Sequence, residues 1–396
     1  MTSPSHTAPT NQRFEYFDSL RAIAVVAILV HHIAYYVGAQ YGAWYSAFCA
    51  RLGVGVTLFF LISGFLLYRP YAVSMLGGPR APSAGVYAGR RALRILPAYW
   101  LAMTLLAVWP GLPGVFESEW WALYGLLQSY SLDWLFKGIS PAWSLSVEAA
   151  FYVMLPFLGF ALVRAGRGLD LGSRLRLQLV TLACCGAFGL GYRAFTFHQH
   201  SLVLLGTTLP AFLLWFAVGM SVAVVSAWYE GRELEWGPTH WLATHSGWCW
   251  AIAAGVLMGM SLSKVFPRPF SKQPDTMASY LGEHILYALV ALLMMLPAVF
   301  GEREGGLPRR LMGTRAFRWL GRISYGLFLW HAPLLSAFQQ RGWSKLIPNM
   351  PFVSLTLLGV PVVIACAWVS WRLVEQPALR LAHARRSRQG PAEEPK

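Results

Sequence analysis

Charged side chains are scarce in this chain of 396 residues. They make up 12% of the sequence, whereas hydrophobic residues make up 56%. A soluble domain carries about 25% charged residues, so this chain lacks the polar side chains that a water-exposed surface of its size requires. Apolar runs recur from Tyr16 to Val374. The composition therefore indicates a protein that is solvated mainly by a lipid bilayer.

Acidic residues and cysteines are also few. The sequence has 17 Asp and Glu against 32 Lys and Arg, and its five cysteines form no CxxC pair. This pattern argues against a disulfide framework and against a cysteine-based metal site, and we expect neither a metal nor a permanently bound cofactor. The basic residues stand in short clusters between the apolar runs, which is typical of topology signals rather than of a nucleic-acid-binding surface.

The long apolar segments predict the fold class. A helix needs about 20 mostly apolar residues to cross a bilayer, so we predict an all-α, polytopic membrane helical bundle of about ten transmembrane helices. A further apolar segment, 120–136, is aromatic and broken, and we expect it to lie in the interface or to re-enter the bilayer. The ten expected spans are 16–38, 53–74, 93–110, 143–164, 177–195, 205–229, 247–263, 282–300, 318–339 and 352–374.

The distribution of basic residues predicts the orientation. Ten spans put both termini on one side, and the loops on that side carry most of the Lys and Arg, so the positive-inside rule puts both termini in the cytoplasm. We divide the chain into a disordered N-terminus (1–13), one membrane domain (14–380) and a basic tail (381–396). The basic loops are 75–92, 165–176, 230–246 and 301–317.

Three polar residues share one face of the first apolar segment. Asp18 and Arg21 are three residues apart, and His32 follows Arg21 by eleven residues, which is about three helical turns. We expect Asp18 and Arg21 to pair at the cytoplasmic mouth. A rise of about 16 Å from Arg21 puts His32 near the bilayer centre, where an imidazole is suited to act as a general base. His31 points about 100° away, and we expect a core histidine held by another helix.

Arg91 and Arg94 are one turn apart at the cytoplasmic end of the third segment. Two roles stay open for them. They can be positive charges that set the topology, or they can bind an anionic substrate, because the planar guanidinium group binds phosphate in a bidentate manner.

Glu148 lies about one and a half turns into the fourth segment. A carboxylate there could orient a histidine, accept a proton from a hydroxyl or pair with a basic residue, and the sequence leaves all three open. In the second segment, no GxSxG context marks Ser63 as a nucleophile. We therefore expect the small residues Ser63 and Gly64 to serve close helix packing.

The ninth segment carries Ser324 and Tyr325 near its cytoplasmic end and His331 near mid-depth. An ionisable side chain inside a bilayer needs a partner or a function. Glu375 stands two residues before Pro377, which ends the last segment. We expect Glu375 to pair with a cytoplasmic arginine.

Taken together, these motifs resemble those of acyltransferase family 3, the bacterial membrane O-acyltransferases that modify surface glycans, peptidoglycan, glycolipids and some macrolides. The resemblance runs from Phe17 to about Arg380, and the order and spacing of the motifs make it specific. The matching motifs are Arg-x10-His (21–32), FFLISGF (59–65), RRxxR followed by Pro-x-Tyr-Trp (90–100), WSLSVE (143–148), ISYxLxLWH (323–331) and VEQP (374–377).

The resemblance implies roles for seven residues. His32 and Glu148 match catalytic positions of the family. The chain departs from the family pattern after Glu148, where Ala149 and Ala150 replace a second acid and a glutamine that are frequent there. The positions implied to contact the co-substrate acyl-CoA are Arg21, Arg91, Arg94, Ser324 and Tyr325.

The resemblance also implies an activity and a location, the bacterial cytoplasmic membrane. An acyl group, acetyl in the simplest case, passes from cytoplasmic acyl-CoA to a hydroxyl of an extracytoplasmic sugar, glycolipid or cell-envelope polysaccharide. A macrolide or other secondary metabolite is a second acceptor class. Two schemes stay open, because His32 either deprotonates the acceptor or is itself acylated first. A membrane transporter is the rival class, but no inverted repeat is evident in the sequence.

Overall fold

The computed structural model describes residues 15–38, 45–199, 203–230, 245–266, 276–300 and 306–381. All regular structure in these ranges is helical, which confirms the all-α prediction. The predictions of a disordered segment at 1–13 and of a basic tail after residue 381 lie outside the described residues.

Eight helical segments are long and apolar enough to cross a membrane, so the chain is a multi-pass membrane protein. Each coincides with one of the ten expected spans. They are Tyr16–Tyr36, Ser46–Met75, Ala84–Gly111, Ser140–Ala165, Leu171–His198, Leu205–Trp228, Met277–Val299 and Pro351–Leu381.

The other two expected spans are helical but shorter. The seventh is α10 (Ser246–Leu262), with 17 residues. The ninth is divided at Ile323 into α13 (Arg315–Arg322) and the 17-residue α14 (Ser324–Gln340). The division has a physical reason, because α13 carries three arginines in eight residues and such a segment stays at a polar surface rather than in hydrocarbon.

The helices have the following bounds. The long ones that matter for the site are α1 (Glu15–Tyr36), α3 (Val54–Met75), α4 (Ala84–Leu106), α6 (Trp143–Ala165) and α14. The remaining helices are α2 (Ser46–Arg51), α5 (Trp120–Tyr124), α7 (Leu171–His198), α8 (Leu209–Trp228), α11 (Met277–Val299), α12 (Gly306–Met312) and α15 (Pro351–Ser370), which a wider turn extends over Trp371–Glu375. The segment 120–136 is broken as expected, with α5 followed by turns and one short 3-10 helix, Gln128–Tyr130.

Close backbone contacts fix the packing of α3 against its neighbours. A Cβ on Gly64 would lie 2.5 Å from the carbonyl oxygen of Phe216 in α8, and a Cβ on Gly219 would lie 2.1 Å from that of Leu61. These glycines let the backbones of α3 and α8 approach more closely than any side chain allows. The expectation that Gly64 serves close packing is therefore confirmed.

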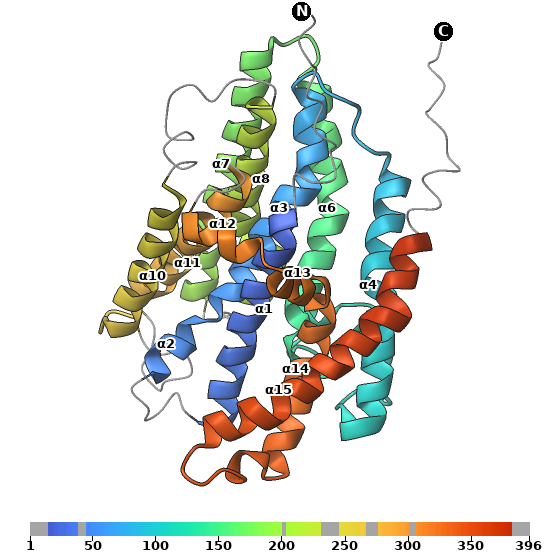
Figure 1. Ribbon diagram of the computed structural model, residues 1–396. Coiled ribbons are helices and arrows are strands. Elements are labelled where there is room, and N and C mark those ends of the chain that lie inside the picture. Colours follow the sequence, from blue (N-terminus) through green and yellow to red (C-terminus); the bar gives the residue numbers. More distant parts are fainter. Residues whose placement is uncertain are drawn as a thin grey trace, which may run out of the picture.

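The ends of the bundle differ in charge. The α3–α4 and α6–α7 connections lie at the same end, at the top of Figure 1, and the α14–α15 connection lies at the other. The first two connections belong to the predicted basic loops 75–92 and 165–176. We call the end that carries them the basic end. That this end faces the cytoplasm stays a prediction.

Candidate active site

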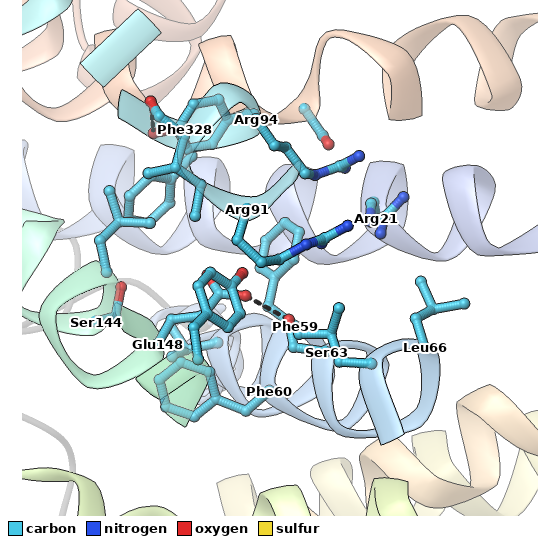
Figure 2. A pocket seen from close by; sticks show the side chains of 17 residues that line it. Arg21, Phe59, Phe60, Ser63, Leu66, Arg91, Arg94, Ser144, Glu148 and Phe328 are labelled. Atoms are coloured by element: carbon cyan, nitrogen blue, oxygen red, sulfur yellow. Dashed lines mark hydrogen bonds between the residues drawn. The ribbon is translucent and has the colours of Figure 1, made fainter. Parts of the chain in front are cut away.

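One cavity collects most of the predicted site. Five helices line it, namely α1, α3, α4, α6 and α14, and its empty space amounts to about 760 Å³ including the open mouth. We call it the arginine pocket (Figure 2). Six of the seven predicted site residues line it: Arg21, Arg91, Arg94, Glu148, Ser324 and Tyr325. The seventh, His32, is not among its lining residues.

Three guanidinium groups give the pocket its chemical character. Arg91 and Arg94 come from the first half of α4, and Arg21 comes from the first half of α1. In Figure 2 the nitrogen ends of all three point into the same space. Three cations that converge on one cavity can bind a polyanion such as the phosphates of a nucleotide.

The three arginines differ in whether their guanidinium groups already have partners in the protein. Arg21 donates to the Asp18 carboxylate at 3.0 Å, which confirms the predicted pair. Arg91 and Arg94 form no hydrogen bond or ion pair within the described part of the chain, and the Nε of Arg91 is buried without a partner there. Because a buried polar group without a partner is costly, this donor is suited to a ligand that the pocket binds.

Glu148 contacts Ser63 and not His32. The Ser63 hydroxyl donates to the Glu148 carboxylate, and Tyr152, one turn further along α6, lines the same cavity. The contacts of His32 involve other residues. The expected role of Glu148 in orienting His32 therefore has no contact to support it, whereas the options of a proton acceptor or a partner for the arginines stay open.

Ser63 is a functional candidate that the sequence argument missed. The sequence favoured helix packing over a role as a nucleophile, but the Ser63 side chain lines the arginine pocket and bonds to Glu148, which lies 85 residues away in the chain. The only signal in the sequence was a polar residue in an otherwise apolar segment, FFLISGF.

Ser324 and Tyr325 line the pocket from the first turn of α14. The Tyr325 hydroxyl donates to the carbonyl oxygen of Ile95 at 3.0 Å, which ties α14 to α4. A ligand in the pocket therefore meets the ring of Tyr325 while its hydroxyl is held by the backbone. Ser324 is buried.

His32 belongs to a histidine pair further along the bundle. Its Nδ1 lies 3.3 Å from Nε2 of His331 and 3.0 Å from the carbonyl oxygen of Ile28. His331 is fully buried, whereas His32 keeps partial exposure. His31 turns to a different neighbour and contacts the carbonyl oxygen of Cys49 in α2 at 3.1 Å, as expected for a core histidine.

The geometry of the pair assigns its protons. Nδ1 of His331 lies 3.0 Å from the carbonyl oxygen of Leu327 and 2.7 Å from that of Phe328. Both partners only accept, so this Nδ1 carries a hydrogen and, in the neutral ring, Nε2 is an acceptor. The Nδ1 of His32 then donates to His331 and to Ile28. It follows that Nε2 of neutral His32 carries a lone pair and can take a proton.

Phe328 stands between the arginine pocket and the histidine pair. Its ring lines the pocket, and its centroid lies 5.9 Å from that of His331. The pocket and the pair are therefore neighbouring parts of one region, with an aromatic ring between them. Among the described residues, no group of three or more His, Cys, Asp and Glu side chains could hold a metal ion.

Comparisons with known proteins show the family to which the chain belongs. The sequence model described as "Acyltransferase domain", that of acyltransferase family 3, matches residues 14–372. The chain is 26% identical to "Nodulation protein 10" of Rhizobium leguminosarum, over 83% of this chain and 82% of that protein. It is also 26% identical to the exopolysaccharide production protein ExoZ of Rhizobium meliloti, over 84% of this chain and 91% of that protein.

A third relative is longer than this chain. The peptidoglycan O-acetyltransferase OatA of Listeria monocytogenes is 22% identical over 91% of this chain, but the match spans only 55% of OatA. No solved structure matches the chain. The family model covers most of the sequence, from residue 14 to residue 372, and so includes both the arginine pocket and the histidine pair; the chain belongs to acyltransferase family 3.

Proposed function

We propose that this protein is an O-acyltransferase of the bacterial cytoplasmic membrane. It takes an acyl group, acetyl in the simplest case, from cytoplasmic acyl-CoA and gives it to a hydroxyl of an extracytoplasmic sugar, glycolipid or cell-envelope polysaccharide. The observation that carries the proposal is the convergence of Arg21, Arg91 and Arg94 on one pocket beside the histidine pair.

The arginine pocket suits the donor. Acyl-CoA carries phosphate groups, and guanidinium groups bind phosphate through charge-assisted hydrogen bonds. Arg91 and Arg94 have no protein partner among the described residues, so their donors are available. From the pocket, the pantetheine arm extends past Phe328 toward His32, and the thioester comes to rest beside the imidazole.

The lone pair on Nε2 of His32 suits the chemical step. The imidazole accepts the proton of the acceptor hydroxyl, and the oxygen attacks the thioester carbonyl carbon. A C–O bond forms, the C–S bond breaks, and the CoA thiolate leaves and takes the proton from His32. His331 holds the Nδ1–H of His32 and thereby keeps Nε2 facing the reaction; it is a positioning residue. In the alternative scheme, Nε2 of His32 is itself acylated before the acceptor arrives.

The relatives support the choice of acceptor. One of them is named for O-acetyl transfer to peptidoglycan and another for exopolysaccharide production. A cell-envelope glycan is therefore our first choice of acceptor for this chain. No observation in the described structure favours a transporter or a macrolide acceptor over it.

Purified protein in lipid nanodiscs tests the proposal with radiolabelled acetyl-CoA and envelope glycan fragments. His32→Ala should abolish transfer while the thermal unfolding midpoint stays close to that of the parent protein. Arg91→Gln should raise the KM for acetyl-CoA about 10- to 100-fold, because a hydrogen bond to a charged group is worth about 1.5–3 kcal/mol.

Arg372→Gln is the matched control. Arg372 is exposed, bonds to Gln376 at 2.7 Å and is absent from the pocket lining, so its loss should leave the KM for acetyl-CoA unchanged. Turnover retained by His32→Ala would overturn the catalytic assignment. Movement of an unmodified solute into vesicles, without release of CoA, would favour the transporter.

A further inference from the structure

A second cavity lies at the opposite end of the same helices. It has about 740 Å³ of empty space including its open mouth, and we call it the distal cavity. Its lining comes from the end of α1, the segment after α4, the segment before α6 and the second half of α14: Tyr36, Pro110, Gly111, Leu112, Pro113, Phe136, Gly138, Ser140, Ala332, Pro333, Ser336, Ala337 and Gln340.

Two helices, α1 and α14, run through both cavities. In α1 the arginine pocket uses Arg21 and the distal cavity uses Tyr36, about 22 Å further along the axis. In α14 the arginine pocket uses Ser324, and the distal cavity reaches Gln340, about 24 Å away. The two cavities therefore lie toward different ends of these helices, and the arginine pocket lies nearer the basic end.

The histidine pair lies between the two cavities. The ring centroid of Tyr36 is 6.2 Å from that of His32, one turn earlier in α1, and Ala332 directly follows His331. On the other side, Phe328 connects His331 with the arginine pocket. The distal cavity thus reaches the side of the pair that faces away from the arginines.

The lining of the distal cavity is polar but uncharged. None of the described residues that line it carries a formal charge. The hydroxyls of Tyr36 and Ser140 make no hydrogen bond within the described part of the chain, and the Gln340 amide donates only to Ser336, at 3.3 Å. Phe136 and Tyr36 add aromatic surface. Two cations lie beside the lining without belonging to it, and both have partners. The Arg341 guanidinium bonds to the carbonyl oxygen of Ala337 at 3.2 Å and lies 5.2 Å from the ring of Trp109. Lys137 lies 3.6 Å from the carboxylates of Glu117 and Glu119.

We infer that the distal cavity is the acceptor site and that it binds a neutral sugar unit, one of whose hydroxyls reaches His32. Hydroxyls and an amide without strong internal partners can bond to sugar hydroxyls, and aromatic rings can pack against the apolar face of a sugar ring. Phosphorylated and carboxylated units are disfavoured, because no cation lines the cavity to replace their hydration. This inference rests on the proposed function, because it names the site and the chemical class of the acceptor in that reaction.

A photoreactive probe tests the site without requiring turnover. The parent protein in nanodiscs is irradiated with a diazirine-bearing glucoside, and the labelled peptides are mapped by mass spectrometry. Labels should fall within 136–140 or 332–340, excess methyl glucoside should suppress them, and glucose 6-phosphate should not. Labels elsewhere, no labels, or equal suppression by the phosphorylated sugar would overturn the inference.

Kinetics with a neutral saccharide separate this inference from the proposed function. Gln340→Leu and Ser336→Leu should each raise the KM for the saccharide about fivefold, since each removes about one hydrogen bond. Thr356→Leu is the control. Its hydroxyl bonds only to Phe352 in its own helix and lies outside the cavity lining, so all kinetic constants should stay unchanged. An unchanged saccharide KM in both α14 variants would refute the acceptor site and leave the transferase standing. Labelling of the cavity without any acyl transfer would refute the transferase and leave a sugar site.

Discussion

Gly321→Ala should damage both stability and donor binding. A Cβ at Gly321 would lie 1.8 Å from the carbonyl oxygen of Asp18 and 2.3 Å from its carbonyl carbon, whereas ordinary contacts begin at 3.4 Å. The backbones of α13 and α1 would therefore have to separate by about 1.6 Å. The obstacle is backbone rather than a flexible side chain. We therefore expect Gly321→Ala to lower the unfolding free energy by about 3 kcal/mol, at the upper end of the usual cost of overpacking.

The same displacement reaches the arginine pocket. Asp18 holds Arg21 at 3.0 Å, and a misplacement of about 1 Å can cost a site up to about 10²-fold in rate. We expect the KM for acetyl-CoA to rise at least about tenfold. Thermal unfolding followed by tryptophan fluorescence, together with donor kinetics in nanodiscs, measures both effects.

Gly259→Ala is the control for Gly321→Ala. A Cβ at Gly259 of α10 meets nothing within 4 Å, so this change should alter the unfolding free energy by no more than about 1 kcal/mol, the difference in helix propensity. Parental stability and parental donor KM in Gly321→Ala would refute the claim that this crossing positions Arg21.

Other substitutions test other contacts. His331→Leu should lower kcat about 10- to 100-fold with little change in the KM for acetyl-CoA. His331→Gln should recover part of this loss, because its amide oxygen can still accept from His32. An equal loss of kcat in both variants would argue against a positioning role for His331. Ser63→Ala should lower kcat/KM about fivefold by removing a donor to Glu148, whereas Ser221→Ala, whose hydroxyl bonds only within α8, should not. Arg51 is buried and pairs with Glu283 at 2.6 Å, so Arg51→Leu should cost about 3–5 kcal/mol of unfolding free energy. Adding Glu283→Leu should restore part of it.

Much of the fold could be predicted because the bilayer imposes it. A spanning segment has to satisfy its own backbone hydrogen bonds and present apolar side chains, so length and hydropathy locate the helices. The prediction erred where composition changes within one segment. The expected span 318–339 contains the arginines of α13 and is divided at Ile323, because those arginines keep its first part at a polar surface.

The candidate site could be predicted in part. Residue spacing along one helix predicted the Asp18–Arg21 pair and the shared face of Arg91 and Arg94, because helical periodicity determines which side chains are neighbours. Contacts between helices could not be found this way. One sequence does not tell which way each helix turns about its axis, so the bond from Ser63 to Glu148 and the approach of His331 to His32 came only from the structure.

The histidine pair also has a consequence for biosynthesis. Its two members are separated by 299 positions in the chain, so a nascent polypeptide that has already inserted its first helix still lacks the second imidazole. Until α14 enters the bilayer, the early helices cannot form the pair, and the half-made protein should split thioesters at least about 10-fold more slowly, as expected for the loss of His331. Full acyl-transfer activity is thus reached only after the late helix α14 has been inserted. Two co-expressed fragments, divided between α8 and α10, should regain full activity only when both fragments are inserted in the same membrane.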